Sequence, residues 1–441
     1  MPGFGWIRGY ITLACLCLLL PFAAFGQTAR PDAPKVTQVW YDLSLDLVRH
    51  TPTQSPPVAS RALAYIGVTT FEVAASGDPD LLSFAGQLNG LTPLPVRDGT
   101  QPYDEALVLH SALSSVVGAL FQNTGPTGQR ALTAVTEKLG AAVRAGLDQG
   151  VADRSAAYGQ ALGAHILAWA AQDGGAEVGN LGFATDYQPG KDPAEWVPTS
   201  SVAMQQSPLL TGWGRNRPFA MPDGATCTLP PPPVYSEQEG SEFYTEAREV
   251  YDTVRSLTPE QKAIARFWAD DAMLSRTPPG HWIAIALQVL NDQGADQSRR
   301  AEVLALLGVG MADAFIGCWN VKYEYRLLRP ITYIRRVIDP AWEPLLNTPP
   351  FPEYPSGHST QSAAAAEIMT ALFGDNFAFE DRTPTSEGMK ARAYASFRAA
   401  SEEAGISRLY GGIHFRAAIE RGQEQGRCIA RFVTALHSRR S

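Results

Sequence analysis

Three short segments near the C-terminus carry residue types that bind tetrahedral oxyanions. The segments are Lys322 to Pro330, Pro355-Ser356-Gly357-His358, and Ser407 to His414. Together they supply three cations (Lys322, Arg329 and Arg408), two histidines and a glycine-containing turn. Charge-assisted hydrogen bonds from such cations are among the strong polar contacts of proteins. If folding brings the segments together, the pocket fits phosphate or a phosphate-like anion.

The Pro355-Ser356-Gly357-His358 segment predicts the start of a helix that faces the anion. Ser356 is a suitable N-cap, and Gly357 lets the backbone approach a ligand closely. The first N–H groups of the helix then point at the anion, with His358 on the first turn. Between Arg408 and His414, the pair Gly411-Gly412 predicts a tight turn that brings both side chains toward one point.

The first segment is predicted to place its two cations on one helix. We expect this helix to run from about Gln297 to Leu328, where Pro330 ends it. Lys322 and Arg329 are seven residues apart and would share nearly the same face, with a rise of ~10.5 Å between them. Two long side chains can close that distance by leaning together.

The elements around these segments also have helical patterns, so we expect an all-α fold built of helical bundles. Ala- and Leu-rich stretches dominate, and few stretches alternate as strands do. Thr258, Pro259 and Gln261 match an N-cap, a first-turn proline and a capping-box partner. They are expected to start a helix that reaches Asp271. The other expected helices are 57–76, 103–122, two or three within 129–172, one starting at Glu242, 357–372 and 416–436.

A Pro- and Gly-rich loop segment, residues 173–240, divides the chain. It closes an N-terminal helical half (27–240) and precedes a C-terminal half (241–441) that carries the three segments. Loops of this length are usually functional or act as linkers. Trp196, Trp213 and Phe219 predict that the loop packs over the protein.

Residues 1–26 have the pattern of a secretory signal peptide. Arg8 precedes an apolar run from Tyr10 to Phe25, and small residues occupy the −3 and −1 positions before Gln27. The run is shorter than the roughly 20 residues of a spanning helix. No later segment is expected to be long and apolar enough to cross a bilayer. The mature protein should therefore begin near Gln27 and be exported, to the periplasm or outside the cell.

The composition argues against some classes of binding partner. The formal net charge is −8, and removing Arg8 with the signal peptide makes it −9. An acidic chain without Lys/Arg clusters argues against nucleic acid and anionic membrane surfaces, so small-molecule substrates are expected. Cys227, Cys318 and Cys428 lie outside the signal peptide. They allow one disulfide, as exported proteins often have, or three buried thiols.

In order and spacing the three segments read K-x6-RP, PSGH and SR-x5-H. Here the chain resembles the superfamily that joins vanadium-dependent haloperoxidases with type 2 phosphatidic acid phosphatases and bacterial acid phosphatases. Trp40 to Ala75 and Phe267 to Trp282 also resemble the secreted bacterial haloperoxidase-like branch. The resemblance extends over most of the mature chain and implies an all-α fold in which a helical bundle holds the site.

The resemblance implies which groups bind the anion. Lys322, Arg329 and Arg408 would neutralise the equatorial oxygens of vanadate or phosphate, helped by Ser356 Oγ and the Gly357 N–H. Lys322 would also polarise bound peroxide.

The histidines take the two axial positions in this comparison. His414 would bond vanadium or attack phosphorus, and His358 would be the acid–base group on the opposite side. Asp271 matches an acid that pairs with the site arginines, and its neighbour Asp270 could substitute. One position departs from the family pattern: Ala418 stands where an Asp usually orients the last histidine. A backbone carbonyl or Glu420 would have to take over that role.

Peroxidase and phosphatase functions share this site, and its surroundings favour the first. Thr348 to Pro355 resembles the haloperoxidase sequence, with Phe351 where chloroperoxidases have an aromatic residue and bromoperoxidases a histidine. Phe351 would act as a halide selector or as a hydrophobic staple for the next helix. We therefore expect a vanadium-dependent haloperoxidase-like enzyme that oxidises halide with hydrogen peroxide at vanadate bound to His414. The alternatives are an acid phosphatase that binds phosphate and forms a phosphohistidine, and a non-catalytic exported protein that binds phosphate or vanadate.

Overall fold

Helices build most of the chain that the computed structural model describes, residues 29–188, 190–200 and 205–440, which confirms the all-α prediction. The predicted signal peptide lies outside the described residues. A short antiparallel pair, β1 (Phe379–Asp381) and β2 (Arg392–Tyr394), pairs Phe379 with Tyr394. The helices are α1 (Ala33–His50), α2 (Pro56–Gly77), α3 (Glu105–Leu120), α4 (Pro126–Arg144), α5 (Gln149–Ala170), α6 (Glu242–Arg255), α7 (Pro259–Phe267), α8 (Thr277–Asp292), α9 (Gln297–Tyr325), α10 (Pro330–Val337), α11 (Gly357–Phe373), α12 (Phe397–Tyr410) and α13 (Arg416–Thr434).

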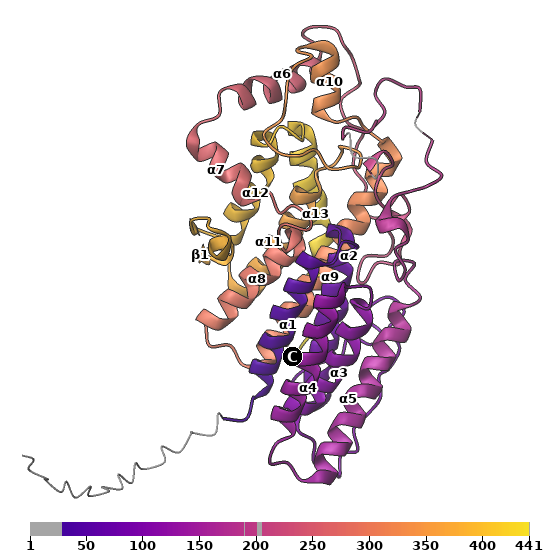
Figure 1. Ribbon diagram of the computed structural model, residues 1–441, viewed down its shortest axis with the longest axis vertical. Coiled ribbons are helices and arrows are strands. Elements are labelled where there is room, and N and C mark those ends of the chain that lie inside the picture. Colours follow the sequence, from indigo (N-terminus) through magenta and orange to yellow (C-terminus); the bar gives the residue numbers. More distant parts are fainter. Residues whose placement is uncertain (1–28, 189, 201–204, 441) are drawn as a thin grey trace, which may run out of the picture. The chain divides into compact units, whose positions relative to one another are not determined.

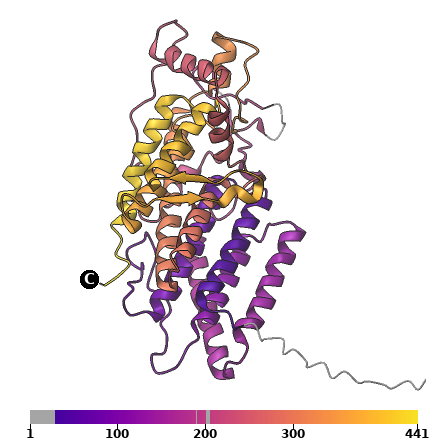
Figure 2. The same cartoon turned by 90° about the vertical axis from the view of Figure 1, so that its left-hand side faces the viewer.

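Within residues 31–441, α1 to α5 gather at one end, and α6 and α10 lie at the other (Figures 1 and 2). The two ends are joined by α9, which packs along α2. A Cβ on Gly67 of α2 would lie 2.7 Å from the carbonyl oxygen of Leu304 and 2.9 Å from the Cα of Ala305. Only glycine allows the two helix backbones to come this close. The predicted halves, 27–240 and 241–441, therefore share a close helix–helix contact.

Composition alone would allow α9 to cross a membrane. The expectation that no later segment is long and apolar enough was wrong on this point, because α9 has 29 residues and a mean hydropathy of 1.7 over its most apolar stretch. That stretch is entirely buried by the rest of the protein. A helix that is apolar all round is also what the core of a large domain requires.

The C-terminal end of α9 differs from the prediction. The helix stops at Tyr325, and Arg326 has a left-handed φ of 48° while its N–H donates to the Lys322 carbonyl. Pro330 cannot continue a helix, because its ring would clash with the carbonyl four residues earlier and it has no N–H to donate. Arg329 is instead the N-cap residue of α10. The prediction that Lys322 and Arg329 share one helix face was therefore wrong.

The start of α7 was predicted correctly, but its end was not. Thr258 and Gln261 form the capping box, with reciprocal bonds of 3.2 Å and 2.9 Å. The helix ends at Phe267, so it does not reach Asp271 as expected. Asp270 has a φ of 48°, a left-handed conformation that terminates helices. Asp270 and Asp271 consequently lie in the loop between α7 and α8.

The long loop packs over the helices, as its aromatic residues predicted. Trp196, Trp213 and Phe219 are all buried. The Asp313 carboxylate on α9 accepts the N–H groups of residues 219–221 at 2.6–2.8 Å. A disulfide joins Cys227 in the loop to Cys428 on α13, and Cys318 is a buried free thiol. The loop is thus fixed to the half that carries the site.

Candidate active site

The predicted site residues lie at the ends of four helices and in the connections beside them. Lys322 is in the last turn of α9, and Arg329 follows at the start of α10. Ser356, Gly357 and His358 begin α11. Arg408 is in the last turn of α12, and His414 lies in the α12–α13 connection. All of these residues except His358 are fully buried, and the His358 side chain is 15% exposed.

Glycines on α13 set how closely it approaches α11. A Cβ on Gly422 would lie 2.8 Å from the Ser356 carbonyl oxygen, and one on Gly426 would lie 2.1 Å from the Thr360 carbonyl oxygen. The Ser356 N–H donates to the Ala418 carbonyl at 3.0 Å. These contacts hold the first turn of α11 beside the segment that carries His414.

The hydrogen bonds of His414 define which ring nitrogen carries the proton. Nε2 lies 3.1 Å from Arg329 Nη1, and Nδ1 lies 2.8 Å from Glu353 Oε1. A guanidinium group can only donate, so Nε2 must accept with its lone pair and Nδ1 carries the hydrogen. Burial, and then the charges of Arg329 and Lys322, hold the pKa of His414 well below its usual value. The ring is therefore neutral, with its lone pair on the side of the cations.

Glu353 was not among the predicted site residues, although it holds the last histidine. Its Oε1 accepts both the His414 ring N–H and the Phe415 backbone N–H, the latter at 2.9 Å. Burial raises the pKa of Glu353 to about 8, although Arg329 and Lys322 oppose that shift. The only sequence signal was a carboxylate inside the run Pro352-Glu353-Tyr354-Pro355, where buried charge needs a partner.

This contact settles how the missing family aspartate is replaced. Ala418 has no carboxylate, and its backbone carbonyl accepts from Ser356 rather than from the histidine. Glu420 is 63% exposed and lies 4.0 Å from Arg416. Neither candidate named from the sequence orients His414, because Glu353, which is 61 positions away in the chain, occupies that place.

The two arginines are held by backbone carbonyls, and each keeps a donor nitrogen unused. Arg329 donates from Nε to the Phe351 carbonyl and from Nη1 to the Ile413 carbonyl, both at 2.9 Å. Arg408 donates from Nη1 to the Trp268 carbonyl. Arg329 Nη2 and Arg408 Nε are buried without a hydrogen-bond partner. Burial lowers the pKa of each to about 10, which leaves both charged at neutral pH.

Lys322 is bound differently from the arginines. Its Nζ donates to the carbonyls of Pro352, Glu353 and Pro355, which uses all three of its hydrogens. Burial lowers its pKa to about 7. In this arrangement Lys322 fixes the turn that carries Glu353 and Ser356, and direct donation to an anion would require it to release one carbonyl.

Phe351 covers the cationic side of the site. Its ring centroid lies 5.3 Å from Lys322 Nζ and 5.0 Å from the Arg329 guanidinium carbon, and 5.0 Å from the Trp319 ring. Such cation–π contacts are stronger when the cation is desolvated. Phe351 thus packs over both Lys322 and Arg329, and its role as a halide selector stays a prediction.

His358 lies near the acidic pair Asp270 and Asp271. Nε2 of His358 has no hydrogen-bond partner and lies 4.0 Å from Asp270 Oδ2. Burial, and then the charge of Arg408, hold the pKa of His358 well below its usual value. Burial raises the pKa of Asp271, opposed by Arg408, so Asp271 is near that arginine while Asp270 is nearer the histidine.

These residues fit a tetrahedral oxyanion better than a bare metal cation. The described residues contain no group of three or more Cys, His, Asp or Glu side chains that could hold a metal ion. The unused donors on Arg329 and Arg408 are the kind that anion oxygens accept. The neutral His414 offers a lone pair at Nε2, and vanadate can take such a nitrogen ligand.

Comparison with known proteins points in the same direction. A family model described as the VCPO second helical-bundle domain matches residues 302–341 and 336–440. Vanadium chloroperoxidase of Curvularia inaequalis is 30% identical over 152 residues, which is 29% of this chain. The matched region spans only 25% of the length of that enzyme.

Two solved structures are similar over almost the whole chain. A bacterial vanadium-dependent iodoperoxidase has 38% sequence identity and a TM-score of 0.82, and the alignment covers 91% of this chain and 97% of that one. A holo-type bacterial vanadium-dependent chloroperoxidase has a TM-score of 0.70 with 15% identity, over 92% and 95% of the two chains. At that identity the second match shows a shared fold.

Proposed function

Because the chain belongs to the superfamily of the vanadium-dependent haloperoxidases, we propose that it oxidises halide with hydrogen peroxide, using vanadate held at His414. The observation that supports this most directly is the neutral His414 ring, whose Nε2 lone pair faces the cations. Similarity to an iodoperoxidase makes iodide the halide that we propose first.

Each residue has a definite task in this proposal. His414 Nε2 would bind vanadium, while Arg329 Nη2, Arg408 Nε and the N-terminal N–H groups of α11 would bind the oxygens. Bound vanadate supplies the activation of peroxide; overall, peroxide, halide and one proton give hypohalous acid and water. His358 would accept a proton from the incoming peroxide at Nε2, which has no other partner. Burial of the cations strengthens their effect on developing negative charge.

Export is part of the same proposal. The pattern of residues 1–26 predicts a signal peptide. The disulfide between Cys227 and Cys428 supports a working place outside the reducing cytosol.

The test compares two activities in one purified protein. Iodide oxidation by peroxide would be measured with and without orthovanadate, beside hydrolysis of p-nitrophenyl phosphate. We expect vanadate-dependent oxidation that is lost in His414→Ala and kept in His437→Ala, which changes an exposed histidine. Hydrolysis of the ester that vanadate inhibits would instead identify a phosphatase. If neither activity is found, the protein would be one that binds the anion without turning it over.

A further inference from the structure

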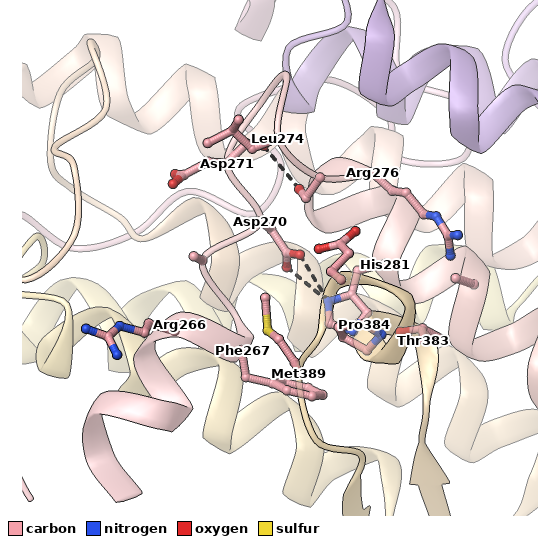
Figure 3. Close-up of a pocket in the computed structure, with 14 residues that line it drawn as sticks. Arg266, Phe267, Asp270, Asp271, Leu274, Arg276, His281, Thr383, Pro384 and Met389 are labelled. Atoms are coloured by element: carbon pink, nitrogen blue, oxygen red, sulfur yellow. Dashed lines mark hydrogen bonds and ion pairs between the residues drawn. The ribbon is translucent and has the colours of Figure 1, made fainter. Parts of the chain in front are cut away.

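A third histidine, His281 on α8, lies between two carboxylates close to the site. Its Nδ1 is 3.1 Å from both carboxylate oxygens of Asp270, and its Nε2 is 2.8 Å from Asp381 Oδ2 (Figure 3). The three side chains are buried, and His281 is 4% exposed. The sequence did not single out His281, since its partners lie 11 and 100 positions away.

The geometry requires His281 to be an imidazolium. Carboxylate oxygens face both of its ring nitrogens, and carboxylates accept hydrogen bonds, so both nitrogens must carry hydrogen. Burial opposes the charge, but Asp270 and Asp381 outweigh it and raise the pKa of His281 to about 10. The Trp268 ring stacks on the imidazolium at 4.7 Å. Asp381 is itself fixed, because its Oδ1 accepts the N–H and hydroxyl of Thr383 at 2.9 Å and 2.7 Å.

Asp270 is therefore shared unequally between two histidines. Both of its oxygens are directed at His281, as Figure 3 shows, whereas His358 Nε2 is 4.0 Å away. A distance of 4.0 Å is too long for a hydrogen bond. The buried Nε2 of His358 is thus without a partner although a carboxylate lies beside it.

We propose that His281 is a positioning residue that draws the Asp270 carboxylate away from His358, so that His358 is uncharged and able to accept a proton. Asp381 acts through His281 by keeping it charged and in place. Without the imidazolium, Asp270 would be free to approach His358 and stabilise its protonated form. The consequence for turnover rests on the proposed peroxidase function, but the competition for the carboxylate can be measured without vanadate.

Other charges near the two histidines enter the same balance. Arg408, the charged His281 itself and Arg329 act on His358 and oppose its protonation. Asp271 stands beside Arg408. The cavity that reaches His281, about 190 Å³ in volume, is also bordered by three charged side chains: Arg266, Arg276 and Glu387. None of these other side chains is hydrogen-bonded to Asp270 or His281 among the described residues, so a substitution of His281 changes the partner of Asp270 and removes the positive charge of His281.

The experiment is a histidine titration by ¹⁵N NMR on the full-length mature protein without vanadate. The His358 signal is assigned by its loss in His358→Gln. In His281→Gln we expect the His358 midpoint to rise by about 1 pH unit or more, because a carboxylate within 4–6 Å favours the charged form and the repulsion by His281 is lost. Asp381→Asn should also raise the His358 midpoint, but by less. Thr383→Val is the control, since it removes one bond to Asp381 but no charge, and should leave the midpoint in place.

A double variant distinguishes an effect of the freed Asp270 carboxylate from a general loss of structure. Adding Asp270→Asn to His281→Gln removes the carboxylate, so the part of the rise that the carboxylate causes should be lost; a rise that stays undiminished would come from the lost charge of His281 alone and would contradict the proposal. An unchanged or lowered His358 midpoint in folded His281→Gln would overturn the inference; if that variant does not fold, Asp381→Asn decides in the same way. In the vanadate-loaded protein, the pH profile of iodide oxidation should move with the midpoint. Absence of peroxidase activity would reject the proposed function. The inference about Asp270 would then be decided by the NMR titration alone.

Discussion

Removing the Glu353 carboxylate should weaken vanadate binding without removing any group that touches the anion. Glu353→Ala leaves two buried donors unpaired, the His414 ring N–H and the Phe415 N–H. It also frees the imidazole to rotate or to change tautomer, which would take the Nε2 lone pair away from Arg329. Substitutions of residues that orient a metal-ligating histidine typically cost 10–100-fold in metal affinity or activity.

Glu353→Gln should be the milder change, because an amide oxygen at the Oε1 position can still accept both N–H groups. Net hydrogen bonds contribute about 0.5–1.5 kcal/mol and charge-assisted ones about 1.5–3 kcal/mol. A loss of about 1.4 kcal/mol is tenfold in affinity, so we expect roughly a tenfold effect or less for this variant. Stability should fall in Glu353→Ala by about 1–3 kcal/mol for each buried donor left unpaired.

The assay is isothermal titration of orthovanadate into the metal-free protein, with thermal unfolding measured on the same samples. Glu420→Ala is the matched control, since Glu420 is 63% exposed and makes no contact with His414. The expected order of affinity is wild type and Glu420→Ala, then Glu353→Gln, then Glu353→Ala. Equal affinity in folded Glu353→Ala and Glu420→Ala would refute the reasoning that Glu353 orients the histidine.

Three further predictions follow from single contacts. Phe351→His should change the ratio of bromide to iodide oxidation rates, because the ring lies over both Lys322 and Arg329; identical halide preference would discard Phe351 as a selector. Gly67→Ala should lower the unfolding temperature, since the new Cβ meets the backbone of α9 and overpacking costs about 1–3 kcal/mol; Gly118→Ala on α3, with open space around it, should raise stability by about 0.5–1 kcal/mol. Burial raises the pKa of Glu72 to about 7, so the folded state holds a proton that the unfolded state releases near pH 4.5, and stability should fall as pH rises from 4.5 to 7. Glu72→Gln should flatten this pH dependence: in urea unfolding, the loss of unfolding free energy between pH 4.5 and pH 8 should shrink by up to about 3 kcal/mol. An unchanged slope would exclude Glu72 as its source.

The helical elements were largely predictable because their signals are local. The capping box at Thr258, the helix start after Ser356 and the buried aromatic residues of the loop follow from rules that span a few positions. At the end of α9, the prediction placed the effect of Pro330 too far toward the C-terminus, at Leu328. Pro330 disturbs the helix four residues before itself, and the chain responds at Arg326.

The site was predictable in its residues but not in their partners. The spacing of Lys322, Arg329 and Arg408 suggested an anion pocket, yet it could not show that Lys322 uses its hydrogens on backbone carbonyls. Glu353 and His281 were missed for one reason: each acts on a residue that is distant in sequence. Such pairs depend on the packing of α11 against α13 and of α8 against β1, which no local pattern encodes.

The central claim is that His414 and the surrounding cations form one vanadate site whose occupancy creates the activity. Its most direct test adds orthovanadate stepwise to the vanadate-free protein, and measures bound vanadium and the rate of iodide oxidation in each sample. We expect saturation at one vanadate per chain, a rate proportional to occupancy, and neither binding nor rate in His414→Ala. A rate that does not depend on bound vanadate, or tight binding that persists in His414→Ala, would contradict this claim.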